Sequence, residues 1–363
     1  MANLFDYIEW RGDLTFEQAP FNNVDNLILS CLGYVVLDEL VSGFECCYTT
    51  TVAEAASLFV QLPESVKNLR NEKDEDVLVE MAKTKRFGNL ELLYHVDQTD
   101  RITQKQFAAI TVNLGNGSHY VVYRGTDHTV IGWKEDFNMT FCSAVPAQLE
   151  AVAYLQKMAE CTEGPLYVGG HSKGGNLAIY AGTNGPKEIQ KRIRRIYSFD
   201  GPGFQKSFYE NRGFVRIQDR YCKIVPEESL VGMLFANYRN YRIVESYRTG
   251  FGQHDLLQWK IRNGRFMYRK DLNRKSKRQA AIFNAWFNSL SGEQVFVFVE
   301  TLYDLLCAAH VQSVAQLLKA PFGILRKMAS GFRKLDKGKR GIIWGSMRKL
   351  VSTVLAFIKP GKK

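Results

Sequence analysis

A run of seven residues at positions 169–175 constrains the fold of this chain more than any other segment. It reads Gly-Gly-His-Ser-Lys-Gly-Gly, follows the short apolar run 166–168 and opens a helix-like segment at 176–181. A serine at a sharp turn from a strand to a helix presents its hydroxyl, and glycines two positions before and after it let the backbones pass closely. The helix that begins there directs its N–H groups towards the reacting centre. Ser172 is therefore predicted to be a nucleophile, and the protein a hydrolase.

The composition is typical of a globular protein and limits the classes of function. The chain has 363 residues, of which 45% are hydrophobic, and no apolar run is long enough to span a membrane. The first residues lack the basic start and apolar core of a Sec signal peptide, although non-Sec export stays open. The seven cysteines are scattered without a C-x-x-C pair, and there are six histidines. We therefore expect reduced thiols in a cytoplasmic protein, with no metal site and no cofactor.

The positive charge is concentrated in the C-terminal segment. The net charge is +11, and residues 317–363 hold thirteen lysines and arginines against one acid, Asp336, which places +12 in this segment and −1 in the rest. Aromatic and aliphatic residues are interleaved with the cations. This pattern predicts peripheral contact with anionic membrane lipid. Electrostatic binding of nucleic acid is the less favoured interpretation, and a solvated basic helix pair packed on the body is the alternative without a binding role.

The periodicity divides the chain into three regions. Residues 1–105 have a largely helical pattern and are predicted to pack on a catalytic domain at 106–310, and residues 311–363 form the basic helical tail. Strand-like and helix-like segments alternate between about 106 and 260, which is typical of an α/β fold with a mostly parallel sheet covered by helices. The expected helices include 22–29, 51–56, 76–81 and 147–158, and the expected strands are 107–112 and 119–123, paired as a hairpin, with 195–199, 221–225 and 241–247.

A serine nucleophile needs a base, and two histidines follow Ser172 along the chain. His254 lies in a glycine-containing loop just past the last strand-like segment. The base is expected there when the order along the chain is serine, acid, histidine. His310 lies within a helical pattern, where a packed or surface histidine fits better. We therefore predict His254 as the base.

For the acid that orients the base, the sequence leaves alternatives. Asp200 ends a predicted strand, and a carboxylate at the C-terminal end of a parallel strand faces the active-site crevice. Aspartate is also a common turn cap. Asp255 is adjacent to His254 in sequence and is expected to point away from its ring. Asp200 is favoured over three carboxylates that flank the next strand, Asp219, Glu227 and Glu228.

Two donors are expected for the oxyanion of a tetrahedral intermediate. One is predicted at the backbone N–H of Lys173, the residue after the nucleophile. The other is predicted at Thr126, which follows an apolar strand in an Arg-Gly-Thr turn. The side chain of His171 is expected to pack or to form a hydrogen bond behind the site. The side chain of Lys173 is expected to be solvated, or to favour an acidic substrate.

The motifs around these residues resemble those of lipases. The Arg-Gly-Thr turn at 124–126, followed by the serine motif, resembles the R-G-[ST] and G-H-S-x-G-G pair of class 3, fungal-type lipases. More closely, the chain resembles a bacterial family of lipase-like α/β-hydrolases of largely unknown function, over about residues 3–310. Segments that carry this resemblance include 7–13, 132–137, 199–204 and 254–259.

The resemblance implies an α/β-hydrolase fold, with Ser172 as nucleophile, His254 as base and Thr126 in the oxyanion hole. One position departs from the pattern. Class 3 lipases carry their acid just before a Val-Pro dipeptide, where this chain has Lys223 ahead of Ile-Val-Pro. A lysine cannot orient the histidine, which favours Asp200 as the acid and leaves room for altered catalysis.

These residues together predict a serine esterase or lipase that cleaves a carboxylic ester of a lipid or of an acylated small molecule. A phospholipase or a thioesterase would use the same residues. The alternative of a different class is a catalytically silent protein of hydrolase fold whose basic tail binds anionic membrane.

Overall fold

The chain folds into two compact units. The computed structural model describes residues 2–45, 48–67, 73–100, 102–126, 130–139, 144–235, 241–309, 311 and 321–358. Each unit contains segments that are far apart in the sequence. The boundaries of the units therefore differ from those of the three regions expected from the sequence, and the three regions stay a prediction. Unit 1 contains Met1–Thr99, Phe107–Gly125 and Ala147–Ser276, and unit 2 contains Asp100–Gln106, Thr126–Pro146 and Lys277–Lys363.

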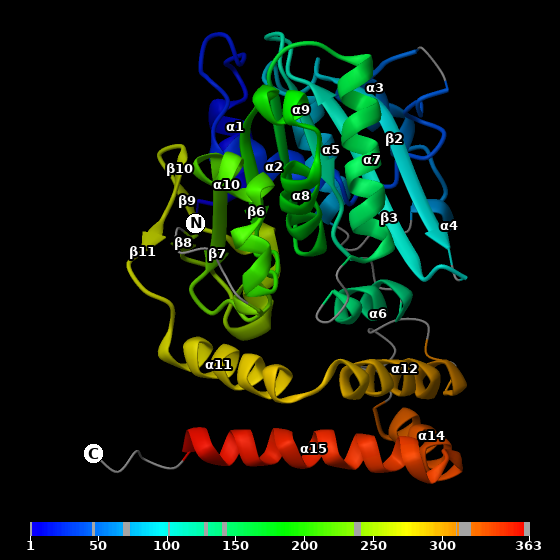
Figure 1. Ribbon diagram of the computed structural model, residues 1–363. Helices are drawn as coiled ribbons and strands as arrows, with labels where there is room; N and C mark the ends of the chain where they lie inside the picture. Colours follow the sequence, from blue (N-terminus) through cyan, green and yellow to red (C-terminus); the bar gives the residue numbers. More distant parts are fainter. Residues whose placement is uncertain are drawn as a thin grey trace. The chain divides into compact units, whose positions relative to one another are not determined.

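A nine-stranded sheet forms the centre of unit 1 (Figure 1). Its strand order is β1-β2-β3-β4-β5-β6-β7-β8-β11. The pairs from β4 to β8 are parallel, and the pairs β1–β2, β3–β4 and β8–β11 are antiparallel. The strands are β1 (Thr50–Thr51), β2 (Glu91–Asp100), β3 (Lys105–Asn113), β4 (His119–Tyr123), β5 (Leu166–His171), β6 (Ile193–Phe199), β7 (Tyr221–Pro226), β8 (Tyr241–Val244) and β11 (Tyr268–Arg269), with a separate pair β9 (Ile261–Arg262) and β10 (Arg265–Phe266).

The predicted hairpin is confirmed. Strands β3 and β4 pair antiparallel, from Ala109 opposite Tyr123 to Asn113 opposite His119. The turn between them contains Gly115 at φ 72° and Gly117 at φ 77°. Residues other than glycine rarely adopt this backbone conformation, so the two glycines explain why the chain reverses there.

Strand β2 differs from the helical pattern expected for the first 105 residues. It contributes ten residues to the sheet, and most of its side chains are only half-buried. The apolar and polar residues in this segment therefore lack the clear alternation that would identify a strand. Pairing with its neighbours in the sheet, rather than local periodicity, accounts for this element.

Helices cover both faces of the sheet because strand side chains alternate between two apolar clusters. Ile110 and Val112 belong to one cluster, and Phe107 and Ala109 belong to the other. The first cluster includes α1 (Leu4–Arg11), α2 (Asn23–Leu32), α3 (Val52–Phe59) and α5 (Lys73–Ala82), and the second includes α7 (Pro146–Cys161), α8 (Lys173–Asn184) and α10 (Arg212–Ile217). Shorter helices are α4 (Glu64–Lys67) and α9 (Lys187–Arg192), with 3-10 turns at Lys206–Glu210, Gln218–Arg220, Val231–Met233, Gly250–His254 and Leu256–Gln258.

A fully buried ion pair joins the N-terminal helices. Nη2 and Nε of Arg86 donate to the two carboxylate oxygens of Asp25, over 2.6 and 2.7 Å. Nη1 of Arg86 also donates to the carbonyls of Leu14 and Ala19, both over 3.0 Å. Asp25 lies in the first turn of α2, where its Oδ2 also accepts from the N–H of Asn22 and closes the capping box. The pair therefore fixes the segment between α1 and α2 to the start of α2.

Arg86→Met is expected to lower the free energy of unfolding by about 3–5 kcal/mol, because the Asp25 carboxylate would stay buried without its cation. Urea unfolding at neutral pH measures this loss. Lys83→Met is the matched control, since Lys83 forms an exposed pair with Glu80 three residues away. Such a surface pair contributes less than about 1 kcal/mol. Equal losses in the two variants would contradict the structural role of the buried pair.

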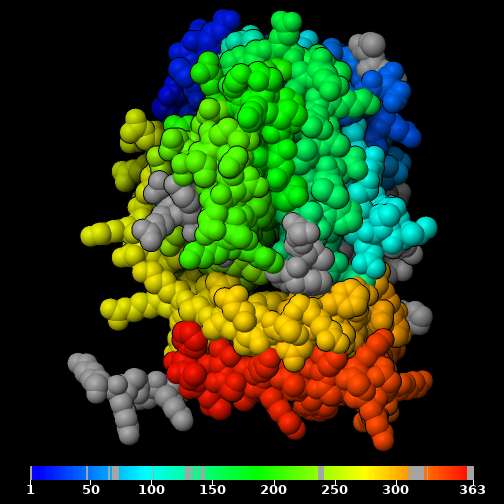
Figure 2. All heavy atoms as spheres, in the orientation of Figure 1, coloured from blue at the N-terminus to red at the C-terminus, as the bar shows by residue number. Residues whose placement is uncertain are grey.

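Unit 2 is mainly helical, as the sequence predicts for its C-terminal part. Trp286 of α11 donates through Nε1 to the carbonyl of Ser346 in α15, over 2.9 Å. Figure 2 shows the side chains of α15 (red) packed directly against those of α12 (yellow to orange). No helix among the described residues combines the length and apolarity needed to cross a bilayer. The helices among its described residues are α6 (Val130–Asn138), α11 (Arg274–Ser289), α12 (Gly292–Ala308), α14 (Pro321–Lys334) and α15 (Lys337–Ile358).

Candidate active site

Ser172 lies at the turn between strand β5 and helix α8, near the middle of the sheet. Its backbone has φ 56° and ψ −128°, a conformation that residues other than glycine rarely adopt. The N–H of Ser172 donates to the carbonyl of Phe199 at the end of the neighbouring strand β6, over 2.9 Å. The strained turn is therefore held by the sheet, as is common at functional sites.

The glycines of the serine motif are required by close packing. A Cβ atom on Gly174 would lie 2.0 Å from the carbonyl oxygen of Tyr123, and one on Gly170 would lie 2.3 Å from the same oxygen. The end of β4 thus passes too close to the turn for any side chain. This confirms the steric role predicted for these two glycines.

Gly174→Ala is expected to destabilise the fold by roughly 1–3 kcal/mol, because either β4 or the serine turn must move. Thermal and urea unfolding measure the loss. Gly341→Ala in α15 is the matched control, because nothing lies within 4 Å of a Cβ at that position. Alanine there favours the helix over glycine. A Gly174→Ala protein as stable as the control would show that the turn is not sterically constrained.

Two hydrogen bonds connect Ser172 with His254 and Asp200. Nε2 of His254 lies 3.0 Å from Oγ of Ser172, and Nδ1 of His254 lies 2.6 Å from Oδ2 of Asp200. A carboxylate only accepts, so Nδ1 carries the proton and donates to Asp200, which leaves Nε2 to accept from the serine hydroxyl. The structure thus brings together three residues that are far apart in sequence, in the order predicted for a nucleophile, its base and the orienting acid.

Asp200 is held by backbone and side-chain contacts at the end of strand β6. It is 1% exposed and has φ 48°. Its Oδ1 accepts from Oγ of Ser229 over 2.5 Å and from the N–H of Gly232 over 3.2 Å. The N–H of Asp200 donates to the carbonyl of Ile224 in β7 over 2.8 Å. One carboxylate oxygen is therefore fixed by its neighbours, and the other faces His254.

The other carboxylates considered from the sequence have different places. Glu227 forms an ion pair with Arg269 in β11. Glu228 accepts from the first residue of the 3-10 turn that carries His254. Asp255 accepts from the N–H of Leu257 and so points away from His254, as expected. Asp219 precedes β7 and lies at its N-terminal end, opposite the end where the serine turn lies. His310, the other histidine considered as base, lies outside the described residues.

Tyr34 and His171 support the backbone of His254 from behind. Nε2 of His171 lies 2.8 Å from the carbonyl oxygen of His254, so this nitrogen carries the proton. Nδ1 then accepts from the hydroxyl of Tyr34 over 2.7 Å. His171 is 2% exposed, in agreement with its predicted place behind the site. The sequence contains no local signal for Tyr34, which lies 137 positions before His171.

Two lysines of the site are buried. Lys173 is 1% exposed, so the expectation of a solvated side chain is wrong. Lys223 is fully buried on β7, and its Nζ donates to the carbonyl of Gly232 over 2.6 Å. The N–H of Gly232 is also a donor to Asp200. Lys223 therefore stabilises the turn that holds the carboxylate of Asp200, although it stands where class 3 lipases have their acid.

Lys223→Met is expected to change how stability depends on pH. Burial lowers the pKa of the Lys223 ammonium from 10.5 to about 7, against the opposing effect of Asp200. Between pH 7 and pH 10.5, Lys223 binds a proton in the unfolded chain but not in the folded chain. The free energy of unfolding therefore increases with pH across this window. The stability that is present above pH 10.5 is lost as the pH falls towards 7. The free energy of unfolding of the wild type minus that of Lys223→Met should therefore rise with pH, by up to about 1.4 kcal/mol per unit.

Urea unfolding of both proteins across this pH range tests the prediction. Lys191→Met is the control, since Lys191 is exposed beside Glu188. The wild type minus this control should show no comparable rise. A flat difference for Lys223→Met would mean that Lys223 keeps an ordinary pKa in the folded protein.

The end of strand β4 lies next to the serine turn. A Cβ on Gly125 would lie 2.2 Å from the hydroxyl of Tyr34 and 3.1 Å from Cβ of Ser172. Thr126 follows directly and belongs to unit 2, where its hydroxyl donates to Oδ2 of Asp136 over 2.5 Å. Lys173 is the first residue of α8. The roles of Thr126 and of the N–H of Lys173 as oxyanion donors stay predictions.

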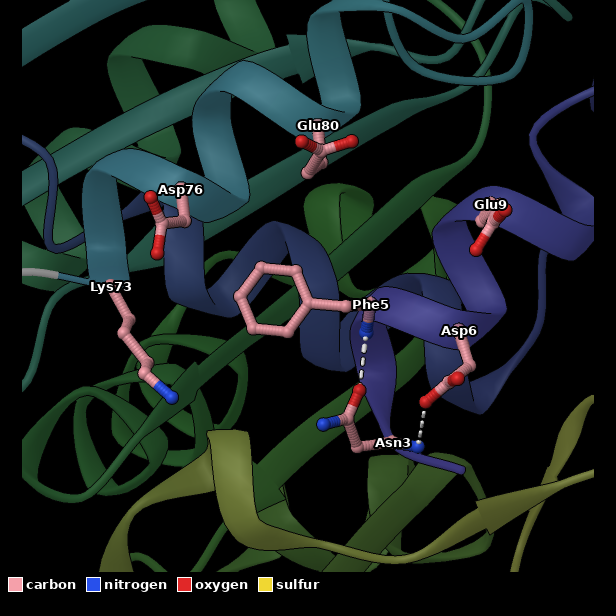
Figure 3. A pocket seen from close by; sticks show the side chains of 7 residues that line it. All are labelled: Asn3, Phe5, Asp6, Glu9, Lys73, Asp76 and Glu80. Atoms are coloured by element: carbon pink, nitrogen blue, oxygen red, sulfur yellow. Dashed lines mark hydrogen bonds between the residues drawn. The ribbon is translucent and has the colours of Figure 1, made fainter. Parts of the chain in front are cut away.

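A groove between helices α1 and α5 is lined by acidic side chains (Figure 3). Two of its lining residues cap the N-terminus of α1: Asn3 accepts from the N–H of Phe5, and Asp6 accepts from the N–H of Asn3. None of the predicted site residues lines it, so the groove is not part of the site around Ser172. Among the described residues, no group of three or more histidine, cysteine, aspartate or glutamate side chains is arranged to hold a metal ion.

Comparisons with known proteins give a family match and several remote structural similarities. The sequence matches the Mbeg1-like family over residues 81–304. No curated protein sequence matches the chain. Among solved structures, M37 lipase is 17% identical, with a TM-score of 0.38, covering 59% of this chain and 70% of that one. A triacylglycerol lipase described as having a serine-protease triad at its catalytic centre is 14% identical, with a TM-score of 0.36, covering 61% and 78%.

A lipase from Rhizopus microsporus var. chinensis is also similar. It is 17% identical, with a TM-score of 0.30, covering 43% of this chain and 61% of that one. The fold itself follows from the structure of this chain. The sheet is parallel through its centre, both faces carry helices, and a strand-to-helix turn with a serine follows β5. The chain has an α/β-hydrolase fold, which confirms the predicted fold class.

Proposed function

We propose that this chain, which belongs to the Mbeg1-like family, is a serine hydrolase that cleaves carboxylic esters. The observation that carries the proposal is the pair of hydrogen bonds from His254 to Ser172 and to Asp200, over 3.0 and 2.6 Å. A weakly acidic hydroxyl becomes a nucleophile only when a base can take its proton, and the base works only when it is oriented. Both conditions are met by described residues.

The proposed reaction has two steps. His254 takes the proton of Ser172 as the serine oxygen attacks the ester carbonyl, and the resulting oxyanion is stabilised by the N–H of Lys173 and by Thr126. The imidazolium of His254, stabilised by Asp200, then gives its proton to the leaving alcohol, and an acyl-serine remains. Water, deprotonated by His254, attacks the acyl group. The second oxyanion collapses, the proton returns to Ser172 and the carboxylic acid leaves.

An apolar side chain beside the base supports an acylated substrate. The ring of Phe251 is 59% exposed, and its centroid lies 5.6 Å from that of His254. It belongs to the same 3-10 turn as His254. An exposed aromatic ring next to the reacting atoms offers contact to a hydrocarbon chain rather than to a charged group. A lipid ester or an acylated small molecule is therefore the proposed substrate class.

A fluorophosphonate probe tests the proposed function directly. We expect one adduct per chain, located on Ser172 by mass spectrometry, and hydrolysis of p-nitrophenyl esters in a series from acetate to long acyl chains. Parallel assays with a phospholipid and an acyl thioester separate lipase from phospholipase and thioesterase activity. A chain that forms no adduct and cleaves none of these substrates would be a catalytically silent hydrolase fold. An adduct on another serine would assign the nucleophile to that serine and contradict the role of Ser172.

A further inference from the structure

One face of helix α15 exposes apolar side chains in a regular row. Trp344 is 58% exposed, Met347 37%, Val351 55% and Leu355 52%. Their spacing of three, four and four residues places them on the same side of an α-helix. The row, called here the α15 stripe, runs along most of a helix of 22 residues. Exposed apolar side chains arranged in this way on one helix face are typical of a surface that binds a protein, a membrane or a ligand.

The opposite side of α15 already has its partners within unit 2. The carbonyl of Ser346 accepts from Trp286, and Leu350 packs against the apolar cluster that contains Trp286. Nζ of Lys349 donates to the carbonyl of Ser289 and to Oε1 of Gln294, over 2.7 and 2.9 Å. On the stripe itself, the ring of Trp344 meets that of Phe332 in α14, with the centroids 6.0 Å apart, and still leaves Trp344 58% exposed. The stripe is therefore available for another partner.

Positive charges border the α15 stripe. Helical spacing places Lys337, Arg340 and Arg348 on the same side of the helix as Trp344. The described residues of α14 and α15, together with the link between them, contain nine lysines and arginines and one acid, Asp336. The carboxylate of Asp336 accepts from the N–H of Lys339 over 2.8 Å and so caps α15. The surface around the stripe is strongly cationic.

We propose that the α15 stripe and its bordering cations are a docking surface for an anionic lipid bilayer. A surface that exposes tryptophan and aliphatic side chains in a row, with cations beside them, suits the interface of a bilayer with anionic headgroups. A helix of 22 residues is roughly 33 Å long, which suits it to lie along the surface. The charge favours anionic headgroups and opposes a second copy of the same face. Nucleic acid would engage the cations but would not bury the apolar row.

Flotation of the full chain with vesicles tests the proposal. We expect binding to vesicles of phosphatidylcholine with about 30% phosphatidylserine, and at least about tenfold weaker binding to phosphatidylcholine alone. The variant Trp344→Ser/Val351→Ser/Leu355→Ser is expected to bind at least about tenfold more weakly, since its apolar contact is removed. Lys337→Gln/Arg340→Gln/Arg348→Gln is expected to bind about tenfold more weakly to the anionic vesicles and to show less dependence on salt.

Two control variants match these changes elsewhere on the molecule. Leu58→Ser/Val215→Ser removes exposed apolar side chains, and Lys187→Gln/Lys191→Gln/Arg194→Gln removes three exposed cations from another surface. Both are expected to bind like the wild type. The stripe side chains are exposed, so circular dichroism should show all the variants folded, and the charge variant tests the surface independently of the apolar one.

Several results would overturn the docking proposal. These are absence of binding to the anionic vesicles, control variants that lose as much binding as the stripe variants, or binding of a DNA duplex by the cations without any vesicle binding. A dimer in sedimentation that the apolar variant dissociates, again without vesicle binding, would assign the stripe to self-association. The fluorophosphonate adduct on Ser172 does not depend on any of these, so failure of one proposal is distinguishable from failure of the other.

Discussion

Ser172→Ala is expected to lower kcat/KM for ester hydrolysis by roughly 10⁴-fold or more, with the fold intact. In the proposed reaction the hydroxyl provides the attacking oxygen, and its described hydrogen bond is to His254. Alanine accepts the same backbone conformation about as well as serine does, so the turn should persist. The loss is measured with a p-nitrophenyl ester under conditions where the wild type is linear in enzyme concentration. Circular dichroism and thermal unfolding show that the variant is folded.

Ser198→Ala is the matched control for this experiment. Ser198 is buried on strand β6, and its Oγ has no hydrogen-bond partner among the described atoms. Its removal takes away one buried hydroxyl close in sequence to Asp200 without touching the proposed reaction. The control is expected to keep kcat/KM within about twofold of the wild type. Equal activity of Ser172→Ala and Ser198→Ala would refute the assignment of the nucleophile.

Asp200→Asn is expected to lower kcat by roughly 10⁴-fold with little effect on the fold. The asparagine side chain has nearly the same shape, and its oxygen can still accept from Ser229 and Gly232. The amide group then faces Nδ1 of His254 as a donor, which turns the imidazole to the tautomer that carries its proton on Nε2. In that form His254 can no longer accept the proton of Ser172.

The contrast with Glu228→Gln makes this test specific for the acid. Glu228 flanks strand β7 and contacts the backbone of the turn that carries His254, yet its carboxylate does not face the imidazole in the described structure. Glu228→Gln is therefore expected to keep most of the activity. The pH profile gives a second readout, because Asp200→Asn should lower kcat at every pH rather than shift the profile. Near-normal activity of Asp200→Asn, with a large loss in Glu228→Gln, would transfer the role of the acid.

Local features of the fold were predictable because their causes lie within a few residues. The hairpin follows from the glycines at 115 and 117, the starts of helices α2 and α3 follow from Asn22 and Thr51, and the serine turn follows from its own glycines. Strand β2 was not predictable in this way, because only its sheet neighbours define it. The basic segment was predicted to be helical, and α14 and α15 confirm this.

The juxtaposition at the site was predictable in part. The chain order and the strand ends led to Ser172, His254 and Asp200, and the structure brings these three together. The choice of Asp200 over the carboxylates near β7 depends on which strand end approaches the histidine loop, and that is a tertiary property. The contacts of Tyr34 and the burial of Lys173 are likewise set by packing between distant segments. No local pattern in the sequence predicts these contacts or this burial.

The link from Tyr34 through His171 to the carbonyl of His254 has a consequence for how the protein becomes active. Tyr34 stands just after helix α2, so the position of the proposed base depends on a segment far before it in the sequence. Without docking of that segment, the loop of His254 would lack this support. During refolding, esterase activity should therefore not recover before the segment that contains Tyr34 has docked. Recovery of activity would measure the rate of this docking.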